Sequence, residues 1–338
     1  MSTNIIEKEI LRLDARRERE EACIKKRIEF NNRWFLGKVW TDDASYRLDE
    51  FIKTNAVWAS LPLNENAYTF FCKNPLLDKS FALFLDSFDA IPYHPDFAFD
   101  IIWRVFEISL YGYGNSHWSP CPEGTHVLIN KACTDIISPS ANKDEKLLAL
   151  IEEYLANVPL SLLRYMFSRM YFKRELGISQ QLVYIQDRCK IVIGDIYELI
   201  AKKYNVFGSN EVSAQDQRNA SLLLSKILRG EDITLGEPQR ICKALSLEKR
   251  IELFINGILF TSRCERFHGD VPSPFKNSLN VSLKRYQSYY FMAAATALLY
   301  YCVLSKEAAI SGTTLFTYDD LAKTFGKIRL NISNMYSD

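Results

Sequence analysis

The sequence predicts a mainly α-helical protein. Glycine and proline are sparse, with 13 and 11 residues in a chain of 338, and long strand-like alternation of apolar and polar residues is rare. Apolar residues make up 48% of the chain and charged residues 25%, as in folded soluble proteins. A chain of this length can bury one large core or two ordinary ones. We therefore expect a helical protein with one or two cores.

The N-terminal part carries several short helical patterns. Residues 5–30 are highly charged, and their cations and anions interleave, which predicts a solvated helix with ion pairs rather than a coiled coil. Further helical patterns follow over residues 42–112, including Leu77–Phe88 and Phe97–Tyr111. We expect a multi-helix N-terminal region.

Residues 112–143 contain the clearest break in these patterns. Three glycines and three prolines lie there, which predicts a loop-rich segment. We place a boundary at its end, so that residues 1–143 form an N-terminal helical region and residues 144–338 a C-terminal helical domain. Helices are expected in the second part at 144–155, 160–175, 182–204, 213–229, 236–244, 246–268 and 280–305, and antiparallel packing with short connections is their natural arrangement.

Charge and cysteine content restrict the classes of partner. The net charge is +1, so any RNA site must be a local basic patch. Eight scattered cysteines without a CxxC pair, and a polar N-terminus without a signal peptide, predict reduced thiols in the cytoplasm. The apolar stretch Tyr289–Leu304 is shorter than the ~20 residues that span a bilayer. We expect it to be a buried helix, and we expect no membrane partner.

A short segment combines a permanent cation with a titratable imidazole. Arg263 and His268 lie at the end of the apolar helix expected over 246–268, and Gly269 supplies its stop. A guanidinium matches the geometry of a phosphate, and the pKa of histidine lies near neutrality. RNA carries its own nucleophile, the 2′-OH, so a histidine that moves protons and an arginine that holds the phosphate need no metal. The pair is therefore a candidate catalytic pair for breaking an RNA phosphodiester.

The wider segment carries a family resemblance. From Ser262 through His268-Gly269-Asp270 to Tyr286, Tyr289 and Tyr290 it resembles the HEPN superfamily, whose mark is Arg, four to six residues, then His, followed by one more helix. The resemblance implies an antiparallel helical bundle, metal-independent endoribonuclease activity, and a role in bacterial toxin–antitoxin or antiphage systems. It also implies RNA as substrate, an antitoxin or regulatory protein as a further partner, and no cofactor or metal.

A homodimer would solve a geometric difficulty of this motif. Arg263 and His268 are about 140° apart around a helix axis, so one helix does not easily aim both at one phosphate. Two copies that meet across a two-fold axis could form a composite site, and the resemblance implies the same arrangement. Four alanines of the last expected helix would permit close approach across a dimer interface, within the core of one chain, or in both places: Ala293, Ala294, Ala295 and Ala297.

A non-catalytic interpretation competes with this one. Arg263 could pair with a nearby acid such as Glu265 or Asp270 while His268 only caps the helix. The family often has a polar residue directly after the arginine, where this chain has Cys264, a small and mostly apolar side chain. The alternative is an RNA-binding or scaffold protein that uses the domain for dimerisation, and both interpretations stay open at this point.

Basic residues interleave with aromatic ones in two places. One cluster runs from Arg164 to Arg174 and the other from Lys284 to Tyr290. Such mixtures can hold a phosphate chain and stack unpaired bases, or they can be amphipathic helices with rings inward and cations outward. The second cluster lies closer to His268, so the predicted RNA-binding residues are Arg266, Lys284, Arg285 and Tyr286.

Metal and nucleotide motifs are weak in this sequence. Four zinc-competent residues share the segment 112–143, but their H-x3-C-x4-H-x6-C spacing matches no common finger or ribbon: His117, Cys121, His126 and Cys133. No GxxxxGK[ST], HExxH or GxSxG motif is present. We therefore predict no metal ligands.

Overall fold

The computed structural model confirms a mainly α-helical protein. It describes residues 58–91, 94–139, 144–171, 180–206, 212–236, 240–267 and 283–334, and a few positions between Arg17 and Lys25. The helices are α3 (Asn66–Lys73), α4 (Pro75–Ala90), α5 (Pro95–His117), α6 (Thr125–Ala132), α7 (Glu145–Ala156), α8 (Leu160–Tyr171), α9 (Gln180–Ile193), α10 (Asp195–Lys203), α11 (Ala214–Leu228), α12 (Leu247–Phe254), α13 (Phe260–Phe267), α14 (Leu283–Ile310) and α15 (Tyr318–Asn334). Two π-helical segments add to them, η2 (Cys133–Ile137) and η3 (Ile255–Leu259).

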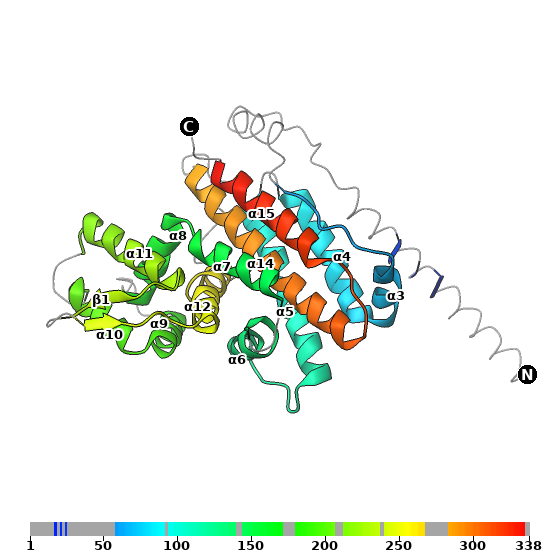
Figure 1. Ribbon diagram of the computed structural model, residues 1–338, viewed down its shortest axis with the longest axis horizontal. Coiled ribbons are helices and arrows are strands. Elements are labelled where there is room, and N and C mark those ends of the chain that lie inside the picture. Colours follow the sequence, from blue (N-terminus) through cyan, green and yellow to red (C-terminus); the bar gives the residue numbers. More distant parts are fainter. Residues whose placement is uncertain are drawn as a thin grey trace, which may run out of the picture.

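The long helix α14 lies at the centre of the molecule (Figure 1). It packs most extensively against α5, and α15 and α8 also contact it. By length and composition it is the one helix of the described ranges that could cross a membrane, but 89% of its most apolar window is buried inside the protein. A core helix of this kind meets the same criteria, so Tyr289–Leu304 lies in a buried helix as expected.

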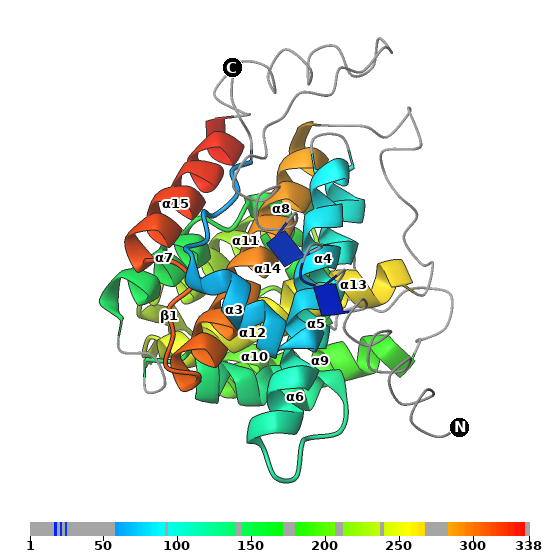
Figure 2. The ribbon, with the colours of Figure 1, turned by 90° about the vertical axis from the view of Figure 1, so that its right-hand side faces the viewer.

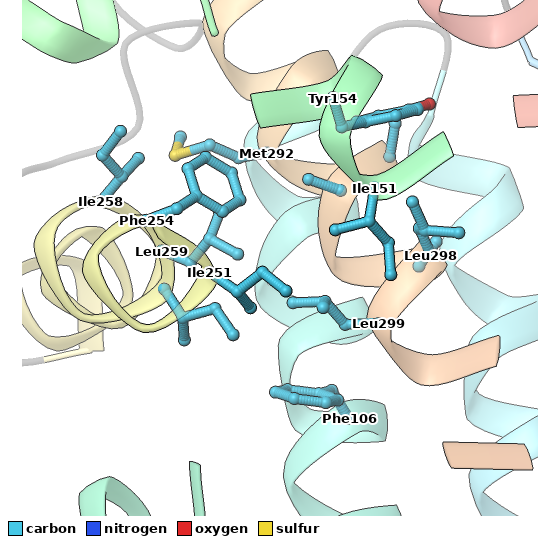
Figure 3. Close-up of a cluster of buried hydrophobic side chains, with 14 of the residues drawn as sticks. Phe106, Ile151, Tyr154, Ile251, Phe254, Ile258, Leu259, Met292, Leu298 and Leu299 are labelled. Carbon is cyan, nitrogen blue, oxygen red and sulfur yellow. The ribbon is translucent and has the colours of Figure 1, made fainter. Parts of the chain in front are cut away.

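The hydrophobic core joins the two sequence ranges that we expected to form separate regions. Figure 3 shows Phe106 of α5 facing side chains from α7, α12, η3 and α14. Phe106 and Leu259 are fully buried, and Leu299 is 5% exposed. One continuous cluster of buried residues extends from Ile24 to Ile332. Helix α5, which precedes the expected boundary at residue 143, thus shares its core with helices that follow it.

The segment 112–143 is more helical than its glycines and prolines suggested. Helix α5 continues to His117, and α6 and η2 cover residues 125–137. Gly112 and Gly114 lie inside α5, and a Cβ atom on Gly114 would come within 2.8 Å of both Trp118 and Cys121. Close packing, and not a turn, therefore explains this glycine, and the prediction of a loop-rich segment was wrong for most of its length.

Two other elements differ from the sequence-based expectation. The helix expected at 236–244 is an antiparallel hairpin, in which β1 (Ile233–Leu235) pairs with β2 (Arg240–Cys242) and Gly236 adopts a φ of 89°. The helix expected at 182–204 divides into α9 and α10 at Gly194, whose φ is 56°. Helix α15 was not predicted at all, although Thr317 and Asp320 form a recognisable N-terminal cap, since the Thr317 hydroxyl accepts from the Asp320 N–H at 3.0 Å.

The alanines of α14 lie in the core of their own chain. Ala293, Ala294 and Ala297 are 0% exposed, and Ala295 is 3% exposed. Their small size lets α14 approach its neighbours closely, above all α5. The intrachain role considered for these residues is therefore confirmed, and homodimerisation stays a prediction.

Candidate functional site

The candidate site lies at the end of a helical run that crosses the core. The run begins at Ser246, whose hydroxyl accepts from the Lys249 N–H at 3.4 Å, and it continues through α12, η3 and α13 to Phe267. In Figure 2, α13 lies at the right-hand side of the helical body. His268 itself lies outside the described residues, as does Gly269. The structure therefore places Arg263 and the helix turn that leads to His268.

Arg266 is tied tightly to α5. Its Nε donates to Asp100 Oδ1 at 2.9 Å, and its Nη2 donates to Asp100 Oδ2 at 2.7 Å and to Asp96 Oδ2 at 3.1 Å. The Arg266 side chain is only 5% exposed, and that of Asp96 is 0% exposed. Burial alone would lower the pKa of Arg266, but the bonds to Asp100 outweigh burial and raise it. The charge of this guanidinium is already compensated by Asp96 and Asp100 inside the chain. Its expected contact with RNA stays a prediction.

Arg263 is held much more loosely. Its Nη2 meets Glu107 Oε2 at 3.3 Å, at the long end of the hydrogen-bond range, and its guanidinium lies 4.5 Å from the ring centre of Phe267. The Arg263 side chain keeps 23% of its exposure, whereas that of Glu107 keeps 12%. Of the acids considered from the sequence, Glu265 pairs with Arg169 instead, and Asp270 lies outside the described residues; the described partner of Arg263 comes from α5. Arg263 can therefore exchange a single weak ion pair for an external anion.

Glu265 anchors the same turn to a third helix. Its carboxylate pairs with Arg169 of α8 and accepts a hydrogen bond from the Tyr165 hydroxyl at 3.1 Å. Glu265 is 5% exposed. Arg266 binds α5 and Glu265 binds α8, so the last turn of α13 is held from two sides.

A cavity of about 250 Å³ opens beside this turn. Its lining combines three arginines, two aromatic rings and one carboxylate: Asp100, Trp103, Arg104, Arg263, Arg266 and Phe267. Arg104 is exposed and Phe267 is 60% exposed, so a cation and a ring are both accessible to solvent. Guanidinium groups bind phosphate and exposed rings stack unpaired bases. The cavity has the chemistry to accept one phosphate and an adjacent base.

Trp103 and Arg104 were missed in the sequence analysis. Both belong to α5, about 160 positions before Arg263, and no local motif connects them to it. The one available signal was the presence of Arg104 inside a strongly apolar helical pattern, since a charged residue on such a helix marks its solvent side.

The other predicted RNA-binding residues lie on the first turns of α14. Lys284 and Arg285 are exposed, whereas Tyr286 is 8% exposed. Tyr289 packs on Arg266, whose guanidinium carbon is 5.2 Å from its ring centre. The tyrosines therefore face the protein while the cations face solvent. The contact of Lys284 and Arg285 with a phosphate chain stays a prediction, and Tyr286 has little surface left for stacking.

The earlier basic–aromatic cluster is largely structural where it is described. Arg169 and Tyr165 hold Glu265, and Phe167 and Tyr171 are buried. Residues 172–174 of this cluster lie outside the described residues. Of the zinc-competent residues, His117 has another partner, since its Nε2 is 2.8 Å from Glu307 Oε2, and Cys133 is buried in η2. No group of potential metal ligands gathers among the residues that the structure describes.

Comparisons of this chain with protein-family models, with curated proteins and with solved structures found no match. The function is therefore argued from the residues of the site.

Proposed function

We propose that this protein is a HEPN-like, metal-independent endoribonuclease that acts in a bacterial toxin–antitoxin or antiphage system. The observation that supports this proposal is the position of Arg263. It lies on the last turn before His268, it is held by one weak ion pair, and it lines a cavity with Arg104 and Phe267. Cleavage by the substrate's own 2′-OH needs a guanidinium and an imidazole at one phosphate, and two copies of this segment would supply them.

The proposed roles follow from chemistry and exposure. His268 takes the proton of the 2′-OH or returns a proton to the leaving 5′ oxygen. Arg263 binds the phosphate and stabilises the charge that develops on it, and Arg104 adds a second cation at the cavity. Phe267 offers a ring for an unpaired base. Lys284 and Arg285 extend the basic surface along the strand, whereas Arg266 acts by positioning the turn.

The proposed enzyme works in the cytoplasm as a homodimer. Because the alanines of α14 are buried within the chain, the two copies would meet through other surfaces, and the outer position of α13 suits a composite site (Figure 2). An antitoxin or regulatory protein would restrain the activity between infections or stress events. Sedimentation at micromolar concentration tests the dimer, because a monomer would leave Arg263 and His268 without a second copy.

The decisive experiment is cleavage of total cellular RNA by the purified protein in EDTA. Wild type should cleave and leave a 2′,3′-cyclic phosphate, because the attacking group belongs to the substrate. Arg263→Ala and His268→Ala should each abolish cleavage while folding is retained, and Arg263→Lys should restore little because lysine lacks the planar fork. The matched control is Arg240→Ala, which alters an exposed arginine of β2. Equal activity of His268→Ala and wild type would contradict the mechanism.

A second candidate function is supported by the ion pairs of α13. Arg263 and Arg266 both pair with carboxylates of α5 in the same chain. In that case the segment would serve a non-catalytic helical protein that binds RNA or another protein. Intact RNA after incubation, together with measurable RNA binding or a defined dimer, would favour this candidate.

A further inference from the structure

The cavity beside α13 combines an acidic group with cationic groups and an aromatic ring. Asp100 and Arg104 line it from α5, and Arg263 and Phe267 line it from α13. Residues four positions apart are neighbours on one face of a helix, so both members of each pair can reach the same ligand. A hydrogen-bond acceptor, two groups of donors and a ring are therefore concentrated in one cavity of about 250 Å³.

Asp100 keeps acceptor capacity although it binds Arg266. The Nε and Nη2 atoms of Arg266 donate to its two oxygens in a fork. A carboxylate has about four acceptor positions, which is more than this fork uses. The Asp100 side chain also remains 32% exposed. Asp100 can therefore accept further hydrogen bonds from a ligand, and the fork holds its carboxylate in a fixed orientation.

Arg104 is the arginine of the cavity that has no partner in the described part of the chain. It is exposed, and it forms no hydrogen bond or ion pair with another described residue. Arg263, by contrast, already meets Glu107. A guanidinium presents five N–H donors in a planar fork, so Arg104 can donate two parallel hydrogen bonds to one ligand. The ring of Phe267, which is 60% exposed, adds a surface for stacking.

Guanine is the RNA base that fits this set of groups. Its Hoogsteen edge has two adjacent acceptors, O6 and N7, which arginine binds in the commonest specific contact with a base. Its Watson–Crick edge has two adjacent donors, N1–H and the 2-amino group, which match a carboxylate. Adenine and cytosine lack this pair of donors, and uracil has one N–H between two carbonyl groups. Guanine alone therefore offers a pair of donors to a carboxylate and a pair of acceptors to an arginine.

We infer that the cavity binds a guanine base of single-stranded RNA. Asp100 accepts from N1–H and the 2-amino group, Arg104 donates to O6 and N7, and Phe267 stacks on the base. Arg263 then meets the adjacent phosphate. The volume is just below the roughly 300–1,000 Å³ of pockets for drug-sized ligands, which suits a single base. The RNA partner rests on the proposed endoribonuclease function, whereas the groups of the cavity themselves select the base.

Calorimetric titration with free nucleotides tests the base without RNA. GMP should bind at least about tenfold more tightly than AMP, because a bidentate contact with an arginine discriminates strongly between bases. IMP lacks only the 2-amino group of GMP and should bind at least about fivefold more weakly, because Asp100 loses one donor. IMP takes the place of an Asp100 variant, since that carboxylate also holds Arg266. Equal affinities for GMP and AMP, or no binding of either, would overturn the inference.

Arg104→Gln tests the arginine at an exposed position, where the Tm should stay that of wild type. The ratio of the affinities for GMP and AMP should fall toward one, because the contact with O6 and N7 is lost. The matched control is Arg218→Gln, which alters an exposed arginine of α11 outside the cavity and should keep the full preference. Phe267→Ala should weaken both nucleotides by similar factors, because stacking tolerates any base. An unchanged preference in Arg104→Gln would overturn the inference.

An oligouridylate with one guanosine at its centre then tests the RNA partner. It should bind more tightly than the same strand with inosine or adenosine at that position, and the protein should cleave it beside the guanosine. Cleavage without any base preference would overturn this inference and leave the proposed function intact. Preference for GMP over AMP in a protein that binds the strand but leaves it uncut would support the base site and contradict the proposed function. Binding of GMP without binding of the strand would overturn the assignment to RNA.

Discussion

Asp100 of α5 and Arg266 of α13, 166 positions apart in the chain, meet in a two-point fork with N···O distances of 2.9 and 2.7 Å. Asp96, one turn earlier on α5 and fully buried, accepts from the same guanidinium. The fork fixes the last turn of α13 to the helix that lines the cavity. The position of Arg263 and of the residues after it thus depends on an ion pair that no local sequence pattern contains.

Breaking this fork should destabilise the whole protein. Arg266→Ala leaves the carboxylate of Asp96 buried without its cation, and removing one member of a buried pair costs about 3–5 kcal/mol. Urea denaturation would measure the loss. Lys284→Ala, which alters an exposed cation of α14, is the control and should change the free energy of unfolding by less than about 0.5 kcal/mol. If Arg266→Ala were as stable as wild type, the fork would not hold α13 in place.

Releasing Arg263 should strengthen RNA binding. Glu107→Gln removes the charge that competes with a phosphate for Arg263, and partly exposed ion pairs contribute about 0–1 kcal/mol, so affinity should rise by roughly two- to fivefold. Fluorescence anisotropy with a labelled oligoribonucleotide at two salt concentrations would detect the change. The matched control is Glu152→Gln, because Glu152 pairs with Arg250 away from the cavity. Weaker binding by Glu107→Gln would mean that Glu107 positions Arg263 and does not compete for it.

Two buried tyrosines should respond in opposite directions to removal of the hydroxyl group. The Tyr301 hydroxyl is buried without a hydrogen-bond partner among the described residues, so Tyr301→Phe should leave the free energy of unfolding unchanged or raise it by about 1 kcal/mol. The Tyr154 hydroxyl donates to the Phe325 carbonyl at 3.0 Å, so Tyr154→Phe should lower it by about 1 kcal/mol. Urea denaturation of both variants is the measurement. A loss of stability in Tyr301→Phe would reveal a polar contact at that hydroxyl.

A fragment that begins at residue 144 should not fold by itself. It contains α14 but lacks α5, so the apolar surface of α14 that packs on α5 would be exposed to water. Circular dichroism during urea denaturation should show no cooperative transition for residues 144–338, in contrast to the full chain. Cooperative unfolding of the fragment would instead support the boundary predicted from the sequence, with two separately stable regions.

Most helices could be predicted because their signals are local. Asp144, Ser213 and Ser246 are N-caps whose side chains accept from backbone N–H groups two or three residues later. The expected helices at 144–155, 213–229 and 246–268 agree with α7, α11 and the run from α12 to α13 for this reason. Where the prediction was wrong, as at the hairpin of residues 233–242, the segment is short and its apolar residues do not distinguish a helix from a strand.

The sequence by itself determined the helical class, the buried character of Tyr289–Leu304 and the proximity of Arg263 to His268 along the chain. Only the tertiary structure decided which arginines are neutralised. The charge of Arg266 is compensated by carboxylates of α5, Arg263 keeps a weak ion pair, and Arg188 has no acidic partner among the described residues. The physical reason is that helical periodicity shows which face of a helix is buried but not which distant helix covers it. Charge compensation depends on that second choice.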